Sequence, residues 1–160
     1  LDLRFDLSKV LFVCTANIIR SPTAEYLLKE KLRAADARPE WQVRSAGTWA
    51  MPGFPVDRTA AELLAEKGID PSQHRSQEIN RELLEWADIV FVMENSHREA
   101  LQIEFPDQKA KIYLLSALQN QQLEVADPVG QSPVEYWAAV EEISRCLASA
   151  PASILELYQN

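Results

Sequence analysis

The chain has only two cysteines among its 160 residues, Cys14 and Cys146, which are too few for a disulfide framework. Nothing in it resembles the spacing of metal ligands, so we expect no metal site. It has no run of 18 apolar residues, and its first eight residues are too polar for a signal peptide, so we expect no membrane insertion. Two free thiols favour a reducing, cytoplasmic location.

Positive charge is also scarce. The chain carries 16 Lys and Arg against 24 Asp and Glu, a net charge of −8, which argues against nucleic acid as a partner. Phosphate binding is still allowed, because it needs only a local positive potential. We find no internal repeat, low-complexity tract or linker, and the length predicts one domain over residues 1–160.

Apolar runs and helix-periodic segments alternate along the chain. Strands are predicted at residues 10–14, 41–46, 88–93 and 110–115, and helices at 22–35, 57–67, 80–86, 95–103, 132–148 and after Pro151. Alternation of this kind predicts an α/β fold, a four-stranded parallel sheet with helices on both faces. Ligands of such sheets bind beyond the carboxyl ends of the strands.

Local signals refine this outline. Pro22 is read as the first helical residue, Asp57 and Asn80 as N-caps, and Ser132 with Glu135 as a capping box. We expect Cys146 in the core, together with three tryptophans, Trp41, Trp86 and Trp137. His97 is expected on a solvated helix face.

The segment from Val10 to Pro22 joins a buried strand, a thiol and an arginine. Cys14 ends the apolar run, and five residues separate it from Arg20. The loop between them leads into a helix, so its N–H groups should converge on an anion, forming a phosphate loop after the first strand. The same surroundings favour the thiolate form of Cys14, which would then face an anionic substrate held by these donors.

Residues Cys14 to Glu25 resemble the phosphate loop of the low-molecular-weight protein tyrosine phosphatases. Further matches follow in the order and spacing of that family, at Arg44–Thr48, Gly68–Ile69 before His74, Asp88–Met93 and Asp127–Pro128. The resemblance therefore covers nearly the whole chain. Cys-x5-Arg alone is a weak pattern, but with a preceding strand and the distant Asp-Pro pair it is specific.

The resemblance implies Cys14 as the nucleophile of a cysteinyl-phosphate mechanism, Arg20 as the phosphate clamp and Asp127 as the general acid and base. It implies no cofactor, a phosphotyrosine-bearing protein as substrate, with a tyrosine kinase as one such partner by analogy, and phosphate or other oxyanions as ligands. The implied phosphate- and substrate-binding residues are Thr15, Ala16, Asn17, Ile18, Ile19, Arg20, Ser21 and Trp49. Ser45 and His74 match supporting positions behind the loop, and a structural role is favoured for His74.

Three departures from the family pattern stand out. Ala16 replaces a usual glycine, so the loop there either keeps a negative φ or is strained. Ile19 replaces a common second cysteine, which removes a protective disulfide. Val129 and Gly130 stand where many animal members have tyrosines, which is typical of a bacterial form.

Alternative functions remain open. An arginine-phosphate phosphatase or an arsenate reductase could use the same scaffold, and a non-catalytic phosphate-binding module would need neither nucleophile nor acid. The reductase would need a thiol relay that Cys146 serves poorly. In the arginine-directed relatives, threonine tends to follow the loop asparagine, whereas Ile18 here suits an aromatic substrate. Asp127 before proline is by default a turn residue, and the family pattern gives it the acid role.

Overall fold

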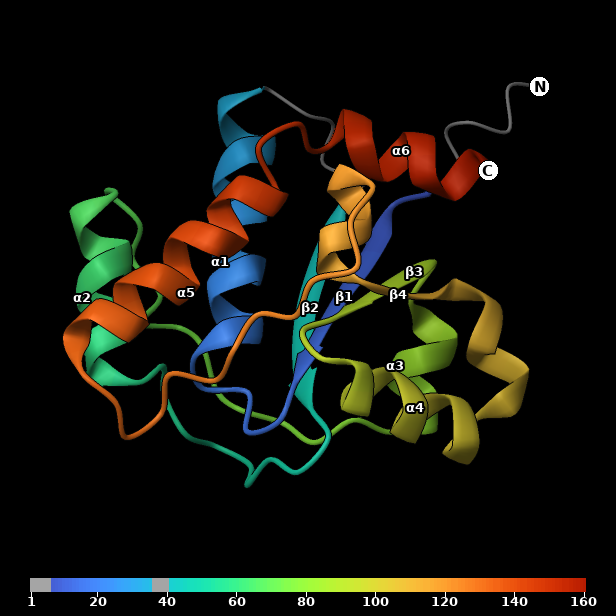
Figure 1. Ribbon diagram of the computed structural model, residues 1–160, viewed down its shortest axis with the longest axis horizontal. Coiled ribbons are helices and arrows are strands. Elements are labelled where there is room, and N and C mark those ends of the chain that lie inside the picture. Colours follow the sequence, from blue (N-terminus) through green and yellow to red (C-terminus); the bar gives the residue numbers. More distant parts are fainter. Residues whose placement is uncertain (1–6, 36–40) are drawn as a thin grey trace.

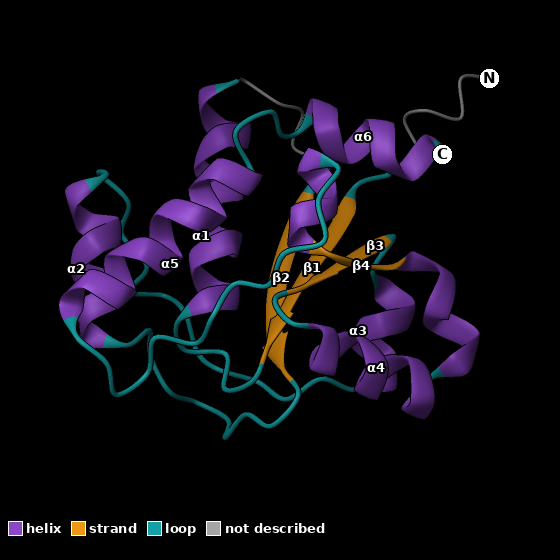
Figure 2. Cartoon of the chain, in the orientation of Figure 1, coloured by secondary structure: helices purple, strands orange, loops and turns teal. Residues whose placement is uncertain are grey.

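A computed structural model describes residues 7–35 and 41–160 of the chain. Four parallel strands form one sheet in the order β2-β1-β3-β4 (Figure 2), namely β1 (Lys9–Cys14), β2 (Gln42–Gly47), β3 (Ile89–Val92) and β4 (Ile112–Leu114). The predicted four-stranded parallel sheet is therefore confirmed. Apart from Lys9 at the start of β1, the residues of its two central strands are apolar and buried, as expected for strands with helices over both faces.

Helices cover both faces of the sheet (Figure 1). One face carries α1 (Arg20–Ala34) and α5 (Pro133–Cys146), with α2 (Arg58–Glu66) packed on α5. The other carries α3 (Arg81–Trp86) and α4 (Asn95–Glu104), while α6 (Ala152–Gln159) packs near one end of the sheet. Alternate residues of β1 enter separate cores, because successive side chains of a strand point to opposite faces.

The region between α4 and α5 is more helical than the sequence indicates. Strand β4 is three residues long, and two short 3₁₀ helices, Pro106–Lys111 and Leu115–Gln119, flank it where a longer strand and a polar loop were predicted. Pro106 ends the α-helical hydrogen bonding, and Asn120 closes the second 3₁₀ helix in a left-handed conformation, with φ of 56°.

Two of the three predicted helix caps are confirmed. The Asp57 carboxylate accepts hydrogen bonds from the first turn of α2, and the Asn80 side chain caps α3. The predicted capping box at α5 is wrong, because Ser132 bonds the Glu135 carboxylate itself and no side chain caps that helix.

Burial of the large aromatic residues differs from the prediction at one position. Trp137 is 55% exposed on α5, so its assignment to the core is wrong, because that position of the helix faces away from the sheet. Trp41 and Trp86 are partly buried against the two cores. Among the helices of the described residues, none combines the length and apolar character needed to cross a membrane.

The strand order positions the site. The chain leaves β1 to form β2 on one side, and it returns to form β3 on the other. In an open parallel sheet, this change of direction leaves a crevice beyond the carboxyl end of the first strand. Cys14 is the last residue of β1 and lies at that crevice.

Candidate active site

The loop between β1 and α1, residues 15–19, forms a turn around the amino end of α1. Asn17 takes a left-handed conformation with φ of 59°, which asparagine tolerates better than most residues. Ala16 is exposed and is not among the positive-φ residues, so its methyl group fits without backbone strain. The helix begins at Arg20, which makes Pro22 its third residue rather than its first; the missing N–H still falls within the first turn.

The Cys14 thiol is buried, with 3% exposure, and its Sγ lies 2.9 Å from Ser21 Oγ. Asn17 Nδ2 donates one hydrogen bond to Ser21 Oγ at 2.8 Å and one to Ser45 Oγ at 2.9 Å. Since Ser21 accepts from Asn17, its own proton is available to the sulfur of Cys14 or to the Ala46 carbonyl oxygen at 3.3 Å. Ser21 can therefore donate to a thiolate.

A buried carboxylate lies behind this network. The Ser45 hydroxyl donates to Glu25 Oε1 at 2.6 Å, and Lys29 pairs with the other oxygen of Glu25. His74 is buried, with Nε2 2.7 Å from the carbonyl oxygen of Asn17, so the structural role favoured for it agrees with its position. Glu25 was not singled out from the sequence, although it is one helical turn after Ser21 and faces the same side of α1.

The end of β2 supports the loop from one side. A Cβ atom on Gly47 would lie 2.3 Å from the carbonyl oxygen of Thr15, so this close approach requires glycine. That carbonyl accepts a hydrogen bond from the backbone N–H of Trp49 at 2.9 Å. The Trp49 side chain is 82% exposed, and it is not among the residues that line the pocket beside Cys14.

Arg20 is 1% exposed, and its guanidinium is held from several sides. Its Nη1 donates to Glu94 Oε2 at 2.7 Å and to the carbonyl oxygen of Val125 at 2.8 Å, which uses both Nη1 hydrogens. Nη2 lies 3.4 Å from both Thr15 Oγ1 and Asp127 Oδ2. The edge formed by Nε and Nη2 therefore remains for two oxygens of a bound phosphoryl group.

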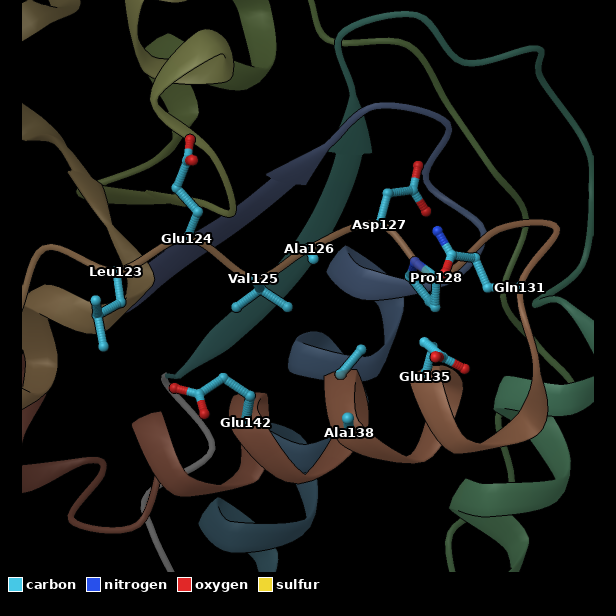
Figure 3. A pocket seen from close by; sticks show the side chains of 11 residues that line it. Leu123, Glu124, Val125, Ala126, Asp127, Pro128, Gln131, Glu135, Ala138 and Glu142 are labelled. Carbon is cyan, nitrogen blue, oxygen red and sulfur yellow. The ribbon is translucent and has the colours of Figure 1, made fainter.

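Asp127 comes from the segment that runs across α5. In Figure 3 its side chain points away from that helix. The backbone N–H of Val129 donates to Asp127 Oδ1 at 3.1 Å, which leaves Oδ2 toward Arg20. The side chain is about one-third exposed, so the carboxylate can meet both water and a bound substrate.

A small pocket of about 40 Å³ lies at this meeting point. It brings together most of the residues selected from the sequence, and its lining is Cys14, Ala16, Asn17, Ile18, Ile19, Arg20, Asp127 and Val129. Thr15, Ser21, Ser45 and His74 lie behind it in the hydrogen-bond network. A larger hollow of about 400 Å³ lies between residues 123–131 and α5 and shares Asp127 with this pocket (Figure 3).

Two neighbours of Arg20 were missed in the sequence. Glu94 lies two residues after the end of β3, and His97, expected on a solvated face, is instead 3% exposed. The solvated assignment is wrong because α4 turns this position toward the carboxyl end of β1. The available signal was the position of Glu94, a charged residue just after an apolar strand that neighbours β1 in the sheet.

The remaining thiol is far less suited to chemistry. Cys146 is buried in the core, as predicted, and burial raises its pKa to about 11, so it stays protonated at neutral pH. Among the residues that the structure describes, no group of three His, Cys, Asp or Glu side chains could hold a metal ion.

Comparison with known proteins agrees with this geometry. Residues 9–156 match the family model of the low molecular weight phosphotyrosine protein phosphatases. A probable low molecular weight protein-tyrosine-phosphatase, EpsP of Ralstonia nicotianae, is 35% identical over 85% of this chain and 88% of its own length. A protein-arginine-phosphatase of Geobacillus stearothermophilus is 34% identical over 94% of this chain and 98% of its own.

The fold is shared as well. The crystal structure of a low molecular weight protein tyrosine phosphatase from T. tengcongensis superposes with a TM-score of 0.84 at 35% identity, covering 93% of this chain and 98% of that one. The match of the family model spans almost all of the described structure and includes the loop that holds Cys14 and Arg20. The chain therefore belongs to the low molecular weight phosphotyrosine protein phosphatase family.

Proposed function

We propose that this protein hydrolyses phosphotyrosine in proteins through a cysteinyl-phosphate intermediate. Cys14 is the nucleophile, Arg20 the phosphate clamp and Asp127 the general acid and base. One observation carries the proposal: a thiol, a buried guanidinium and a partly exposed carboxylate line the same small pocket. Pure phosphate binding would need neither the thiol nor the carboxylate.

In the first step, the Cys14 thiolate attacks phosphorus in line with the tyrosyl oxygen. The S–P bond forms as the P–O bond breaks, and Asp127, in its protonated form, transfers its proton to the departing phenolate. Arg20 and the backbone N–H groups of residues 15–20 stabilise the charge on the three equatorial oxygens. This charge stabilisation comes from the backbone, and not the side chains, of Thr15, Ala16, Asn17, Ile18 and Ile19.

In the second step, water attacks the phosphorus of the intermediate. The Asp127 carboxylate takes a proton from that water, the S–P bond breaks, and inorganic phosphate leaves. Ser21 Oγ lies 2.9 Å from the sulfur and donates a hydrogen bond to the departing thiolate. Asn17 and Ser45 keep the Ser21 hydroxyl in the orientation that this requires.

The substrate preference rests on Ile18. This half-buried, apolar residue lines the pocket beside Asp127, where it suits the ring of tyrosine better than a phosphorylated guanidinium. The exposed ring of Trp49 lies outside the small pocket, and its backbone is bonded to the phosphate loop; we propose that it contacts the substrate ring beyond Ile18. Activity toward phosphoarginine is the alternative, since a relative of similar identity is named a protein-arginine-phosphatase.

The proposal includes the domain organisation, location, ligands and partner of the protein. Residues 1–160 form one phosphatase domain, and free Cys14 and Cys146 fit a reducing cytoplasm. Phosphate and other oxyanions compete with substrate for the pocket. A tyrosine kinase that carries phosphotyrosine is one protein substrate that would fit this activity.

The test compares hydrolysis of phosphotyrosine and phosphoarginine peptides by the wild type, Cys14→Ser and Asp127→Ala. We expect the wild type to prefer phosphotyrosine, Cys14→Ser to be inactive, and Asp127→Ala to lose about 10²- to 10⁴-fold in kcat. When Asp127→Ala is quenched during turnover, the covalent phosphate on Cys14 should be detectable. Full activity of Cys14→Ser would overturn the mechanism, and a preference for phosphoarginine would overturn the substrate.

A further inference from the structure

His97 lies beside both of the side chains that orient Arg20. Its Nε2 is 2.8 Å from Thr15 Oγ1 and 3.5 Å from Glu94 Oε2. Glu94 holds Nη1 of Arg20, and Thr15 lies near Nη2. The imidazole therefore contacts the supports on both terminal nitrogens of the guanidinium without touching the pocket that receives the phosphoryl group.

The hydrogen bonds assign the tautomer of His97. The backbone N–H of Glu94 donates to Nδ1 at 3.1 Å, so Nδ1 carries no proton. In the neutral ring the proton is then on Nε2, which donates to Thr15 Oγ1. Burial lowers the pKa of His97, and the positive charge of Arg20 lowers it further, so the neutral form is the stable one.

The two ring nitrogens therefore have separate functions. Nδ1 completes a capping box with Glu94 at the start of α4, which is a contribution to stability. Nε2 fixes the rotamer of Thr15, whose hydroxyl oxygen accepts from Nε2 and faces Nη2 of Arg20. Capping alone would need Nδ1 and not the contact of Nε2 with the phosphate loop.

We propose that neutral His97 is a positioning residue that holds Thr15 and Glu94 where they orient the Arg20 guanidinium toward the phosphoryl group. As a contribution to catalysis this rests on the proposed phosphatase activity. As a contribution to oxyanion binding it does not, because Arg20 must face a bound phosphate whether or not hydrolysis follows.

Two isosteric substitutions separate the nitrogens. In His97→Asn the amide oxygen takes the place of Nδ1, so the helix cap is kept and the Thr15 contact is lost. In His97→Gln the longer amide reaches the place of Nε2, so the Thr15 contact is kept and the cap is lost. The measurements are kcat and KM on a phosphotyrosine peptide, the Kd of inorganic phosphate by calorimetry, and Tm.

We expect His97→Asn to keep the wild-type Tm, to weaken phosphate binding, and to lose about 10- to 100-fold in kcat/KM, as misplaced catalytic groups do. His97→Gln should restore most of that loss while having the lower Tm. The inference is overturned if His97→Asn binds phosphate like the wild type, or if both variants lose function in proportion to their loss of Tm.

Thr15→Val supplies an independent check on the role of His97. Because His97 acts through the Thr15 hydroxyl, the loss from Thr15→Val should add little in the His97→Asn background. Fully additive losses would overturn the inference. A wild type that binds phosphate without hydrolysing the peptide would contradict the proposed function alone, and the calorimetric comparison would still decide the role of His97.

Discussion

At the scale of single residues, the site is built from buried ionisable groups that are each held by a specific partner. Arg20, Glu25 and His97 have exposures between 1% and 7%, and each makes a hydrogen bond or ion pair within the loop network. Removing one partner leaves a buried charge or donor unsatisfied, which is more damaging than the loss of a surface pair. The stability of the fold and the geometry of the site therefore depend on the same contacts.

The lowered pKa of His97 predicts a specific dependence of stability on pH. Its ordinary value is 6.5, and burial lowers it in the folded protein, so the unfolded chain binds this proton more readily. The free energy of unfolding should therefore fall as pH falls below about 6.5. His97→Asn removes this group and should show a flatter profile.

Denaturant unfolding at several pH values, with the two proteins compared at each, measures this difference. Carboxylates titrate in both proteins and cancel in the comparison. Parallel profiles for the wild type and His97→Asn would contradict the prediction.

The residues of the site differ in how readily the sequence reveals them. Cys14 and Arg20 flank one short loop, so their closeness in the sequence already brings them near each other. Glu94 and His97 reach Arg20 only because β3 pairs with β1 in the sheet, which is a long-range contact. The sequence shows His97 among polar neighbours on a helix, and burial by a distant strand leaves no trace in that local pattern.

At the scale of elements, the close contact between the end of β2 and the phosphate loop is a tight constraint. A methyl group on Gly47 would meet the Thr15 carbonyl at 2.3 Å and Ala50 Cβ at 2.9 Å. The backbone N–H of Thr48 also donates to the carbonyl oxygen of Cys14 at 2.8 Å. Any shift of β2 would therefore move the loop.

Gly47→Ala should displace the phosphate loop. We expect a loss of about 1–3 kcal/mol in the free energy of unfolding, as for overpacked cores, together with a fall in kcat. Gly68→Ala is the matched control, because Gly68 has a φ of +77° with nothing within 4 Å of an added Cβ. That variant should be strained by about 1 kcal/mol, with kcat little changed.

The stability and kcat of the two variants are measured by thermal unfolding and by peptide hydrolysis. If the two alanines reduce kcat equally, the reduction follows from lower stability and not from the loop.

The order and type of the long elements could be predicted, because apolar runs and helical periodicity are strong along this chain. The two 3₁₀ helices and the short extent of β4 could not. The segment 106–119 contains only three strand residues between two 3₁₀ helices, and such turns depend on packing against α4, α5 and α6. The failed capping box at Ser132 has a local cause, since its hydroxyl prefers the Glu135 carboxylate to a backbone N–H.

At the scale of the whole molecule, charge opposes the proposed substrate. The chain has a net charge of −8, and carboxylates of Asp127, Glu94 and Glu124 lie near the pocket. A phosphotyrosine peptide is itself anionic, so long-range repulsion should slow its approach, while Arg20 and the loop bind it only at close range.

Salt concentration should therefore change the rate at which substrate binds, and so kcat/KM, but not the rate of the chemical steps. Raising ionic strength from about 0.01 M to about 0.15 M shortens the screening length from about 30 Å to about 8 Å. We expect kcat/KM to rise for a phosphotyrosine peptide with acidic flanks and to fall for one with basic flanks, with kcat unchanged. Steady-state kinetics on the two peptides would contradict this if both responded in the same direction.

The bond between Arg20 and Val125 has a consequence for when activity can arise. It joins residues 105 positions apart, and Val125 is itself fixed by its N–H bond to the Met93 carbonyl. Synthesis delivers the thiol and the arginine first, so a nascent chain that ends before residue 125 has Cys14 and Arg20 but lacks both this carbonyl and Asp127. We therefore expect the chain to gain its full phosphatase activity only when the segment before α5 has been synthesised and has docked against Arg20.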